Sequence, residues 1–228
     1  MTQASDNEAF VRAAQAAKGL KVDGWAGDKT WTAWGLSAEA TGSVTDLTER
    51  GVLELISHEA IVQEAYKDSV GVWTWAIGVT NASGHEVYPR YKDNPQSLAR
   101  CIEVSVWLMR TKYLPDVLKA FEGHALTEAQ LTAALSFHYN TGAIRRADWV
   151  DSWKNGRADK ARLEIMNWKS PPEIVKRRAA ERDLFFDGRW SNDGMATVYP
   201  VSKPSYSPAW SKAKKVDVTA AVKVALNA

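Results

Sequence analysis

The chain has 228 residues, with 29 Lys and Arg against 27 Asp and Glu, so its formal net charge is only +2. That balance does not by itself indicate a nucleic-acid-binding protein. A single cysteine, Cys101, excludes an intramolecular disulfide framework and any structural zinc site that needs two or more thiolates. The eleven tryptophans are the one unusual count, because residues of this type must either pack in the interior or serve a ligand.

The N-terminal residues 1–20 carry acidic side chains early and lack a basic region followed by an apolar one. They therefore do not have the pattern of a secretory signal peptide. No stretch approaches the roughly 18 uninterrupted apolar residues of a membrane-spanning helix. The sequence predicts a soluble chain that is made in the cytoplasm and is not stably inserted in a membrane.

Three zones can be separated along the chain. Residues 1–43 hold a short helical pattern and a glycine-rich turn, which predict a small helical segment. Residues 44–189 are mostly helical in pattern, interrupted by a β-rich stretch at 65–80, and this predicts an α+β fold dominated by helix with a small β-hairpin or sheet. Residues 190–228 contain prolines, serines and lysines, so we expect a basic, extended tail that ends in a weak helix at 218–226.

Capping signals mark the helices of the middle zone. Thr45 or Thr48 precedes the first apolar-periodic segment, and Ser97 precedes the second. Thr127, followed three residues later by Gln130, forms a capping-box pattern before the third.

Glu59 is the first candidate for chemistry. It continues the apolar stripe of the helix that follows Thr48, whose members at i, i+3 and i+4 are Val52, Leu55 and Ile56. The pattern places this acid toward the core, close to the C-terminal end of the helix. Partial desolvation favours the neutral form of a carboxyl group, which suits a general acid. The same pattern is equally typical of a buried glutamate paired with an arginine, and it does not separate the two interpretations.

Glu54 contrasts with Glu59 on the same helix. It stands one turn from Arg50 and one turn from His58, and a charged stripe of this kind is typical of a solvated helix face. We therefore expect Glu54 to face water.

Asp68 and Thr74 belong to the start of the β-rich stretch. Asp68 stands beside Ser69 and Gly71, where an aspartate is most often only a turn former. Together with Glu59, however, the two residues place an acid at a helix end, a carboxylate in the adjoining turn and a hydroxyl on the next strand. Such a set can line one cleft, in which one carboxyl group protonates a leaving oxygen while the other holds a water, as in glycoside hydrolysis.

The segment 59–74, EAIVQEAYKDSVGVWT, resembles the active-site motif of the phage-type lysozymes, the muramidases of glycoside hydrolase family 24. That motif is a Glu, eight residues, an Asp, five residues and a Thr, with Ala-Tyr two positions before the Asp and a Gly three positions after it, and every spacing matches. Residues 126–130 and 136–142 are similar to the middle helix of the family, and residues 177–185 are similar to its closing helix. The similarity covers about 44–189.

The resemblance implies a mainly helical, lysozyme-like fold in which the small sheet forms one wall of the active-site cleft. It implies Glu59 as the general acid, with Asp68 and Thr74 positioning the hydrolytic water. It also implies that Arg177 or Arg178 holds the Glu59 side chain, and we favour Arg177. No metal ion and no organic cofactor is implied.

Two stretches depart from the usual pattern of the family. Ala60 stands where a Gly usually follows the catalytic Glu, and the Gly-x-Gly-His segment reads Ala76-Ile77-Gly78-Val79, so that a His is missing. We expect these departures to affect local backbone geometry and pH stability rather than the class of reaction.

Residues 21–34, KVDGWAGDKTWTAW, resemble the second half of a small helical peptidoglycan-binding domain. The match is shorter than a full module, so residues 1–43 are either a wall-binding element or an extra helical pair packed on the catalytic domain. Trp25, Trp31 and Trp34 can accordingly be sugar-stacking residues or a small core.

Other chemistries find less support in the sequence. His58-Glu59 begins like the helix of a zinc protease, but Val62 stands where the second His of that motif is required. Cys101 lies on an apolar helix face, which is typical of a buried, inert thiol.

The resemblance implies an endolysin that hydrolyses the β-1,4 bond between N-acetylmuramic acid and N-acetylglucosamine in bacterial peptidoglycan and so lyses the host cell. We expect a monomer that stays in the host cytoplasm until a holin-type membrane lesion releases it to the periplasm and cell wall. Two alternatives stay open: a lytic transglycosylase, which Asp68 and Thr74 disfavour, and a catalytically idle wall-binding or virion protein on the same scaffold.

Overall fold

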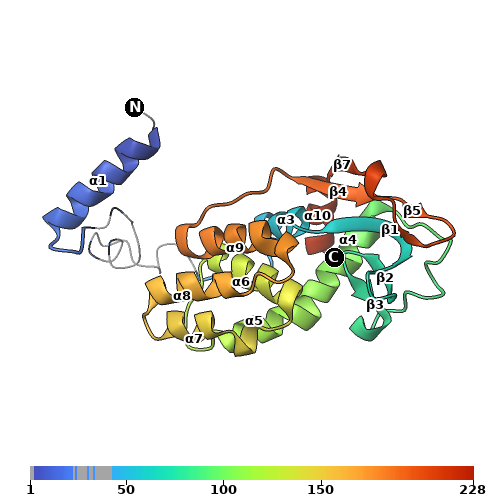
Figure 1. The fold of residues 1–228 in the computed structure, drawn as a ribbon, viewed down its shortest axis with the longest axis horizontal. Helices are drawn as coiled ribbons and strands as arrows, with labels where there is room; N and C mark the ends of the chain where they lie inside the picture. The colour runs from blue at the N-terminus through green and yellow to red at the C-terminus, as the bar shows by residue number, and fades with distance from the viewer. Residues whose placement is uncertain (1–2, 23, 25–29, 31–32, 34–42) are drawn as a thin grey trace.

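The computed structural model describes residues 3–22, 24, 30, 33 and 43–228. Helices α5 to α9 gather on one side of the molecule and strands β1 to β3 lie on the other (Figure 1). The helices are α1 (Gln3–Ala17), α3 (Glu49–Ser57), α4 (Leu98–Leu108), α5 (Leu114–Ala120), α6 (Glu128–Thr141), α7 (Asp148–Lys154), α8 (Ala158–Glu164), α9 (Val175–Asp187) and α10 (Thr219–Leu226). The strands are β1 (Ala60–Lys67), β2 (Trp73–Ala76), β3 (Val79–Thr80), β4 (Met195–Tyr199), β5 (Val201–Ser202), β6 (Ser207–Pro208) and β7 (Lys214–Asp217).

The capping residues stand where the helices begin. The Thr48 side chain accepts a hydrogen bond from Gly51 N at 3.0 Å, which makes Thr48 rather than Thr45 the cap of α3. Ser97 caps α4 in the same way. Thr127 and Gln130 form the expected capping box at the start of α6. Side-chain oxygens thus satisfy backbone N–H groups that the first helical turn leaves unpaired.

A mixed sheet in the order β3-β2-β1-β4-β7 faces the helices. The predicted hairpin corresponds to β1 and β2, which pair antiparallel, with β3 added beside β2. Strand β1, however, begins at Ala60, directly after Glu59, rather than near residue 65. The α+β fold class is confirmed, and the hairpin starts next to the candidate acid.

The C-terminal segment differs from the extended tail that its composition predicts. Strand β4 pairs in parallel with β1, and β7 pairs antiparallel with β4. Helix α10, present where the weak helix is expected, packs on α4 and α3. Val218 and Val222 are buried at its start and middle. The strands take their partners from parts of the chain far away in sequence, which composition does not reveal.

Two of the tryptophans belong to the apolar core. Trp149 is fully buried, and so is Trp75 beside the candidate Thr74. Trp107, by contrast, is 40% exposed. Cys101 is buried as predicted, and burial raises the pKa of its thiol to about 12. Such a thiol is protonated near neutral pH and hence unreactive.

At the N-terminus, Gln15 of α1 is only 2% exposed. Its side chain accepts a hydrogen bond from Gly24 N at 2.9 Å and donates one to Thr30 Oγ1 at 3.2 Å. The sugar-stacking candidates lie outside the described residues: Trp25, Trp31 and Trp34. The choice between a wall-binding and a packing role for residues 1–43 stays a prediction.

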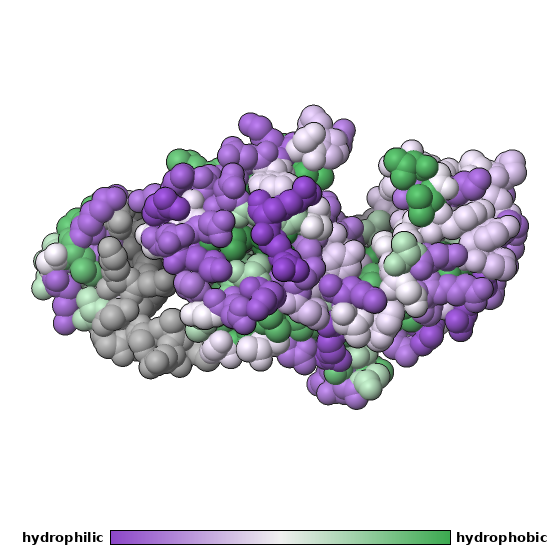
Figure 2. All heavy atoms as spheres, turned by 90° about the horizontal axis from the view of Figure 1, so that it is seen from below, coloured by the Kyte–Doolittle hydropathy of each residue, from purple (hydrophilic) through white to green (hydrophobic). Residues whose placement is uncertain are grey.

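The surface is indented between the helical side and the side that carries β2 and β3 (Figure 2). Polar residues cover much of the helical side in this view. Within the described part of the chain, no helix has both the length and the apolar character needed to cross a bilayer.

Glu54 is buried, and the expectation that it faces water is wrong. It is 1% exposed. Its carboxylate accepts hydrogen bonds from the backbone and side chains of Ser191 and Asn192, at distances from 2.5 to 3.2 Å. His58 lies 3.5 Å away. Burial alone would raise the pKa of Glu54, but the hydrogen bonds from His58, Ser191 and Asn192 outweigh it and lower the pKa to about 2.

This carboxylate predicts a specific acid sensitivity of the fold. The pKa of Glu54 in the folded chain, about 2, lies below its ordinary value of 4.5, so its stabilisation is complete above about pH 5 and is lost as the pH falls toward 2. Wild type should lose about 2–3 kcal/mol of unfolding free energy through this group over that range. Glu54→Gln should have a lower free energy of unfolding than wild type at neutral pH and should lose less of it on acidification. Urea unfolding at a series of pH values measures both. Glu49→Gln removes an equal charge from the same helix, and equal acid dependence of both variants would contradict the assignment.

Candidate active site

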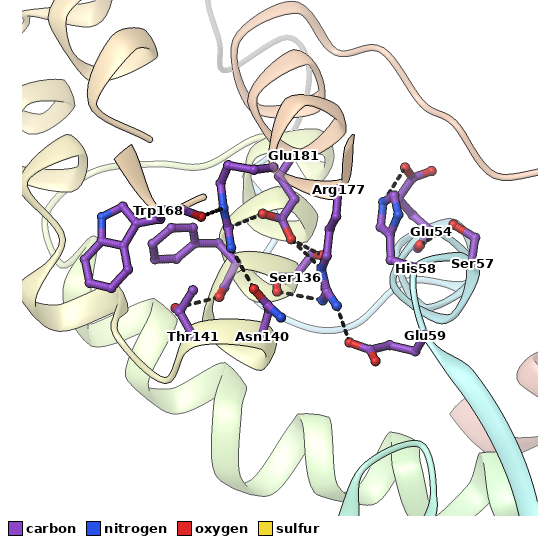
Figure 3. A network of polar contacts seen from close by, with 12 residues as sticks. Glu54, Ser57, His58, Glu59, Ser136, Asn140, Thr141, Trp168, Arg177 and Glu181 are labelled. Atoms are coloured by element: carbon purple, nitrogen blue, oxygen red, sulfur yellow. Dashed lines mark hydrogen bonds and ion pairs between the residues drawn. The ribbon is translucent and has the colours of Figure 1, made fainter. Parts of the chain in front are cut away.

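Glu59 lies between α3 and β1. Helix α3 ends at Ser57, and Glu59 N donates to Ile56 O at 3.0 Å, so the residue follows the helix rather than belonging to it. Its side chain is 26% exposed and forms an ion pair with Arg177 Nη1 (Figure 3). The carboxylate is therefore open to solvent on one side and fixed by a guanidinium on the other.

Arg177 connects Glu59 to two helices. Its Nε donates to Glu181 Oε1 at 2.9 Å on α9, and its Nη2 donates to Ser136 O at 3.0 Å on α6. Ser136 Oγ donates in turn to Glu181 Oε1 at 2.7 Å. Burial opposes the charge of Arg177, but the carboxylates of Glu59 and Glu181 outweigh it and raise the pKa of the guanidinium. Arg177 is therefore a permanently charged partner for Glu59.

Arg178 points to a different environment from Arg177, because consecutive helical residues project about 100° apart. Its side chain is fully buried and pairs with the second oxygen of Glu181. It also donates to Asn140 Oδ1 at 2.7 Å and to Trp168 O at 3.0 Å. Of the two arginines that the sequence leaves open, the structure places Arg177 against Glu59 and Arg178 inside the helical core.

Asp68 forms the turn between β1 and β2. Its Oδ1 accepts hydrogen bonds from Val70 N at 3.0 Å and Val72 N at 2.8 Å, while its own N donates to Val72 O at 3.0 Å. This is a side-chain-stabilised turn, and it uses only one carboxylate oxygen. The second oxygen, Oδ2, takes no hydrogen bond from the described residues.

Thr74 meets the same turn from β2. It is 4% exposed and stands opposite Tyr66 of β1 in the antiparallel register. Its Oγ1 donates to Val72 O at 3.2 Å. Asp68 and Thr74 therefore converge on one carbonyl, and the Thr74 hydroxyl keeps its lone pairs for a further donor.

Tyr66 lies within the electrostatic influence of both Glu59 and the turn residue Asp68. Burial, followed by the negative charges of Glu59 and Asp68, raises the pKa of its phenol to about 12. One neutral hydroxyl thus lies within electrostatic reach of both carboxylates. Glu59 and Asp68 thus flank β1, and Thr74 stands opposite Tyr66 on the neighbouring strand.

Two further tyrosines near Glu59 are not among the candidate residues of the sequence. Burial and the charge of Glu59 raise the pKa values of Tyr113 and Tyr139, whose rings lie 4.6 Å apart. Tyr139 OH donates to Ile77 O in the turn between β2 and β3. Tyr66 is part of the Ala-Tyr pair before Asp68 and Tyr139 lies in the stretch 136–142 that is similar to the family, whereas Tyr113 belongs to no such stretch.

The described residues hold no group of three or more His, Cys, Asp or Glu side chains arranged to bind a metal ion. The chemistry available in this site is that of carboxyl, hydroxyl and guanidinium groups.

The arrangement of a helical body beside a small sheet is that of a lysozyme fold. Solved structures that share it include the endolysin of Escherichia coli O157:H7 phage FAHEc1, at 18% identity and a TM-score of 0.52, and a variant of P22 lysozyme, at 21% identity and a TM-score of 0.50. The alignments cover 64% and 61% of this chain, respectively, and 97% of each of those chains. No curated protein sequence matches the chain.

The family model for phage lysozyme matches residues 56–181, and the chain belongs to the phage lysozyme family. The match includes Glu59, Asp68, Thr74 and Arg177. It ends before β4, β7 and α10.

The arginine network predicts a strong effect of one carboxyl group. Glu181→Gln removes the negative charge between two buried arginines, and breaking a buried ion pair from one side costs about 3–5 kcal/mol. We expect a loss of that size in the free energy of unfolding, measured in urea at neutral pH. Glu173→Gln, an exposed position shortly before α9, is the control and should change stability by less than about 0.5 kcal/mol. Equal stability of the two variants would rule out the network as a major support of the fold.

Proposed function

We propose that the chain is an endolysin that hydrolyses the β-1,4 bond between N-acetylmuramic acid and N-acetylglucosamine in bacterial peptidoglycan. The observation that carries the proposal is that Tyr66 feels the charges of both the arginine-held Glu59 and Asp68, and pairs with Thr74 across the hairpin. Two carboxyl groups with different surroundings are what glycoside hydrolysis requires. Family membership supports the same class of reaction.

In the proposed mechanism Glu59 protonates the glycosidic oxygen as the bond to the anomeric carbon breaks. A water held by Asp68 Oδ2 and Thr74 Oγ1 attacks that carbon, and Asp68 accepts the proton that the water loses. Arg177 keeps the Glu59 carboxyl group in one orientation, and proximity of this kind is a large part of enzymatic rate enhancement. No metal ion or organic cofactor takes part.

The biological setting belongs to the proposal as well. The enzyme acts as a monomer on peptidoglycan, remains in the host cytoplasm until a holin-type lesion opens the membrane, and lyses the host from the periplasmic side. Residues 1–43 serve as a wall-binding element in this proposal or, alternatively, pack on the catalytic domain.

The roles of the three side chains can be tested by their removal. Glu59→Gln should abolish the loss of turbidity of purified sacculi, because an amide cannot deliver the proton. Asp68→Asn and Thr74→Ala should each lower turnover by about 10²–10⁴-fold, at a temperature where circular dichroism shows both variants to be folded. Glu103→Gln, a partly exposed carboxylate paired with Arg100 on α4, is the control and should keep full activity. Equal clearing by wild type and Glu59→Gln would favour the catalytically idle protein.

The products separate hydrolysis from transglycosylation. Hydrolysis adds one water at every cleaved bond, whereas a lytic transglycosylase leaves anhydro-muramyl ends. We expect mass spectrometry of digested sacculi to show only products that carry the added water, because Asp68 and Thr74 provide for its binding. Anhydro-muramyl ends as the main product would replace the hydrolase assignment by the transglycosylase.

A further inference from the structure

The segment that follows α9 lies outside the family match, which ends at residue 181. It runs back toward the N-terminal end of the lysozyme fold, where it contacts α3 and then β1 (Figure 1). These are the two elements on either side of Glu59. The segment thus contacts the chain just before and just after the candidate acid, and it lies outside the region that matches the family.

Its first contacts cover one face of α3. The guanidinium of Arg50 lies 4.0 Å from the centre of the Trp190 ring. One turn later, the buried Glu54 carboxylate binds Ser191 and Asn192 through five hydrogen bonds. Four of the five are donated by Ser191 N and by the two nitrogens of Asn192, so the carboxylate fixes the course of the main chain as well as the side chains.

Its next contacts extend to β1. Strand β4 pairs with β1 in parallel, beginning with Thr197 opposite Ala60, the residue directly after Glu59. Strand β7 closes the far side of β4, and Val218 N donates to Gly194 O at 3.0 Å. Helix α10 then packs on α4 and α3. The backbone on both sides of Glu59 is therefore tied to residues 190–226.

The same stretch of chain also holds the side chain of Glu59. Helix α9 carries Arg177 and ends at Asp187, with Gly188 as its left-handed cap. Only a few residues later the chain contacts Glu54. One continuous segment thus binds the Glu59 carboxylate through Arg177 of α9. It also contacts α3 and β1, the elements before and after Glu59.

We propose that residues 190–226 form a strap that positions Glu59, and that Glu54 is the positioning residue that anchors the strap. The proposal rests on the proposed function, in which Glu59 is the acid. Glu54 touches neither substrate nor reacting atoms in this proposal; it acts through the course of the backbone. A displacement of about 1 Å at a reacting group can cost on the order of 100-fold in rate.

A positioning role differs measurably from a purely structural one. Loss of a merely stabilising contact lowers the unfolding temperature but leaves the folded enzyme with its normal turnover. Loss of a positioning contact lowers kcat in the folded enzyme, while KM changes little because the substrate-binding groups stay in place.

The test compares full-length Glu54→Gln with Glu49→Gln on a soluble peptidoglycan fragment, at a temperature where circular dichroism shows every variant to be folded. We expect Glu54→Gln to lower kcat about 10- to 100-fold with KM within about twofold of wild type, and Glu49→Gln to match wild type. Ser191→Ala, which removes only the 2.5 Å bond to Glu54 Oε1, should lower kcat in the same direction by a smaller factor. If Glu54→Gln does not fold, the kcat of Ser191→Ala tests the positioning role instead.

Wild-type kcat in the folded Glu54→Gln and Ser191→Ala variants would overturn the strap as a positioning device. A wild-type chain without activity would instead contradict the proposed function, and the strap is then judged by amide hydrogen exchange at residues 60–62. Faster exchange there in Glu54→Gln than in Glu49→Gln supports the strap, and equal exchange overturns it.

Discussion

The ion pair between Arg177 and Glu59 joins positions that are 118 residues apart, and the geometry of the site depends on it. A buried guanidinium is stable only where carboxylate and carbonyl oxygens satisfy its five N–H groups. Those oxygens come from Glu59, from Glu181 on α9 and from Ser136 on α6. The three contacts fix α6, α9 and the end of α3 relative to one another. The need of the Arg177 guanidinium for oxygen partners therefore sets the position of the candidate acid.

The local part of this arrangement can be predicted from the sequence. The caps at Thr48, Ser97 and Thr127 act within one helical turn, and the spacing from Glu59 to Thr74 lies within one hairpin. Patterns of this length reflect contacts between close neighbours in the chain. The preference for Arg177 over Arg178 rests on the resemblance to the family and not on local patterns. Only the structure shows which guanidinium contacts Glu59.

Contacts between distant parts of the chain account for what the sequence does not predict. Periodicity assigns Glu54 correctly to the helix face shared with Arg50 and His58, but it does not reveal that Ser191 and Asn192 cover that face. A charged stripe has the same pattern whether water or a loop satisfies it. The pairing of β4 with β1 is unpredictable for the same reason, because the sequence of a strand of five residues does not indicate which strand it pairs with. Tyr113 belongs to this group as well, because it lies outside every stretch that resembles the family.

The departures from the family pattern acquire a physical meaning in the fold. Ala76 stands where the family usually has Gly, and its backbone is left-handed, with φ of 53°, a conformation that costs a residue with a Cβ about 1 kcal/mol or more. The turn nevertheless keeps this shape. Tyr139 from α6 binds the carbonyl of the next residue, Ile77, and Val79 packs fully buried where the family usually has His. Contacts from the helical body therefore hold the turn in a conformation that its own residues do not favour. The backbone at Ala60 is likewise held by a contact from elsewhere in the chain. Its extended conformation is fixed by pairing with Thr197 of β4 and does not depend on the residue type at position 60.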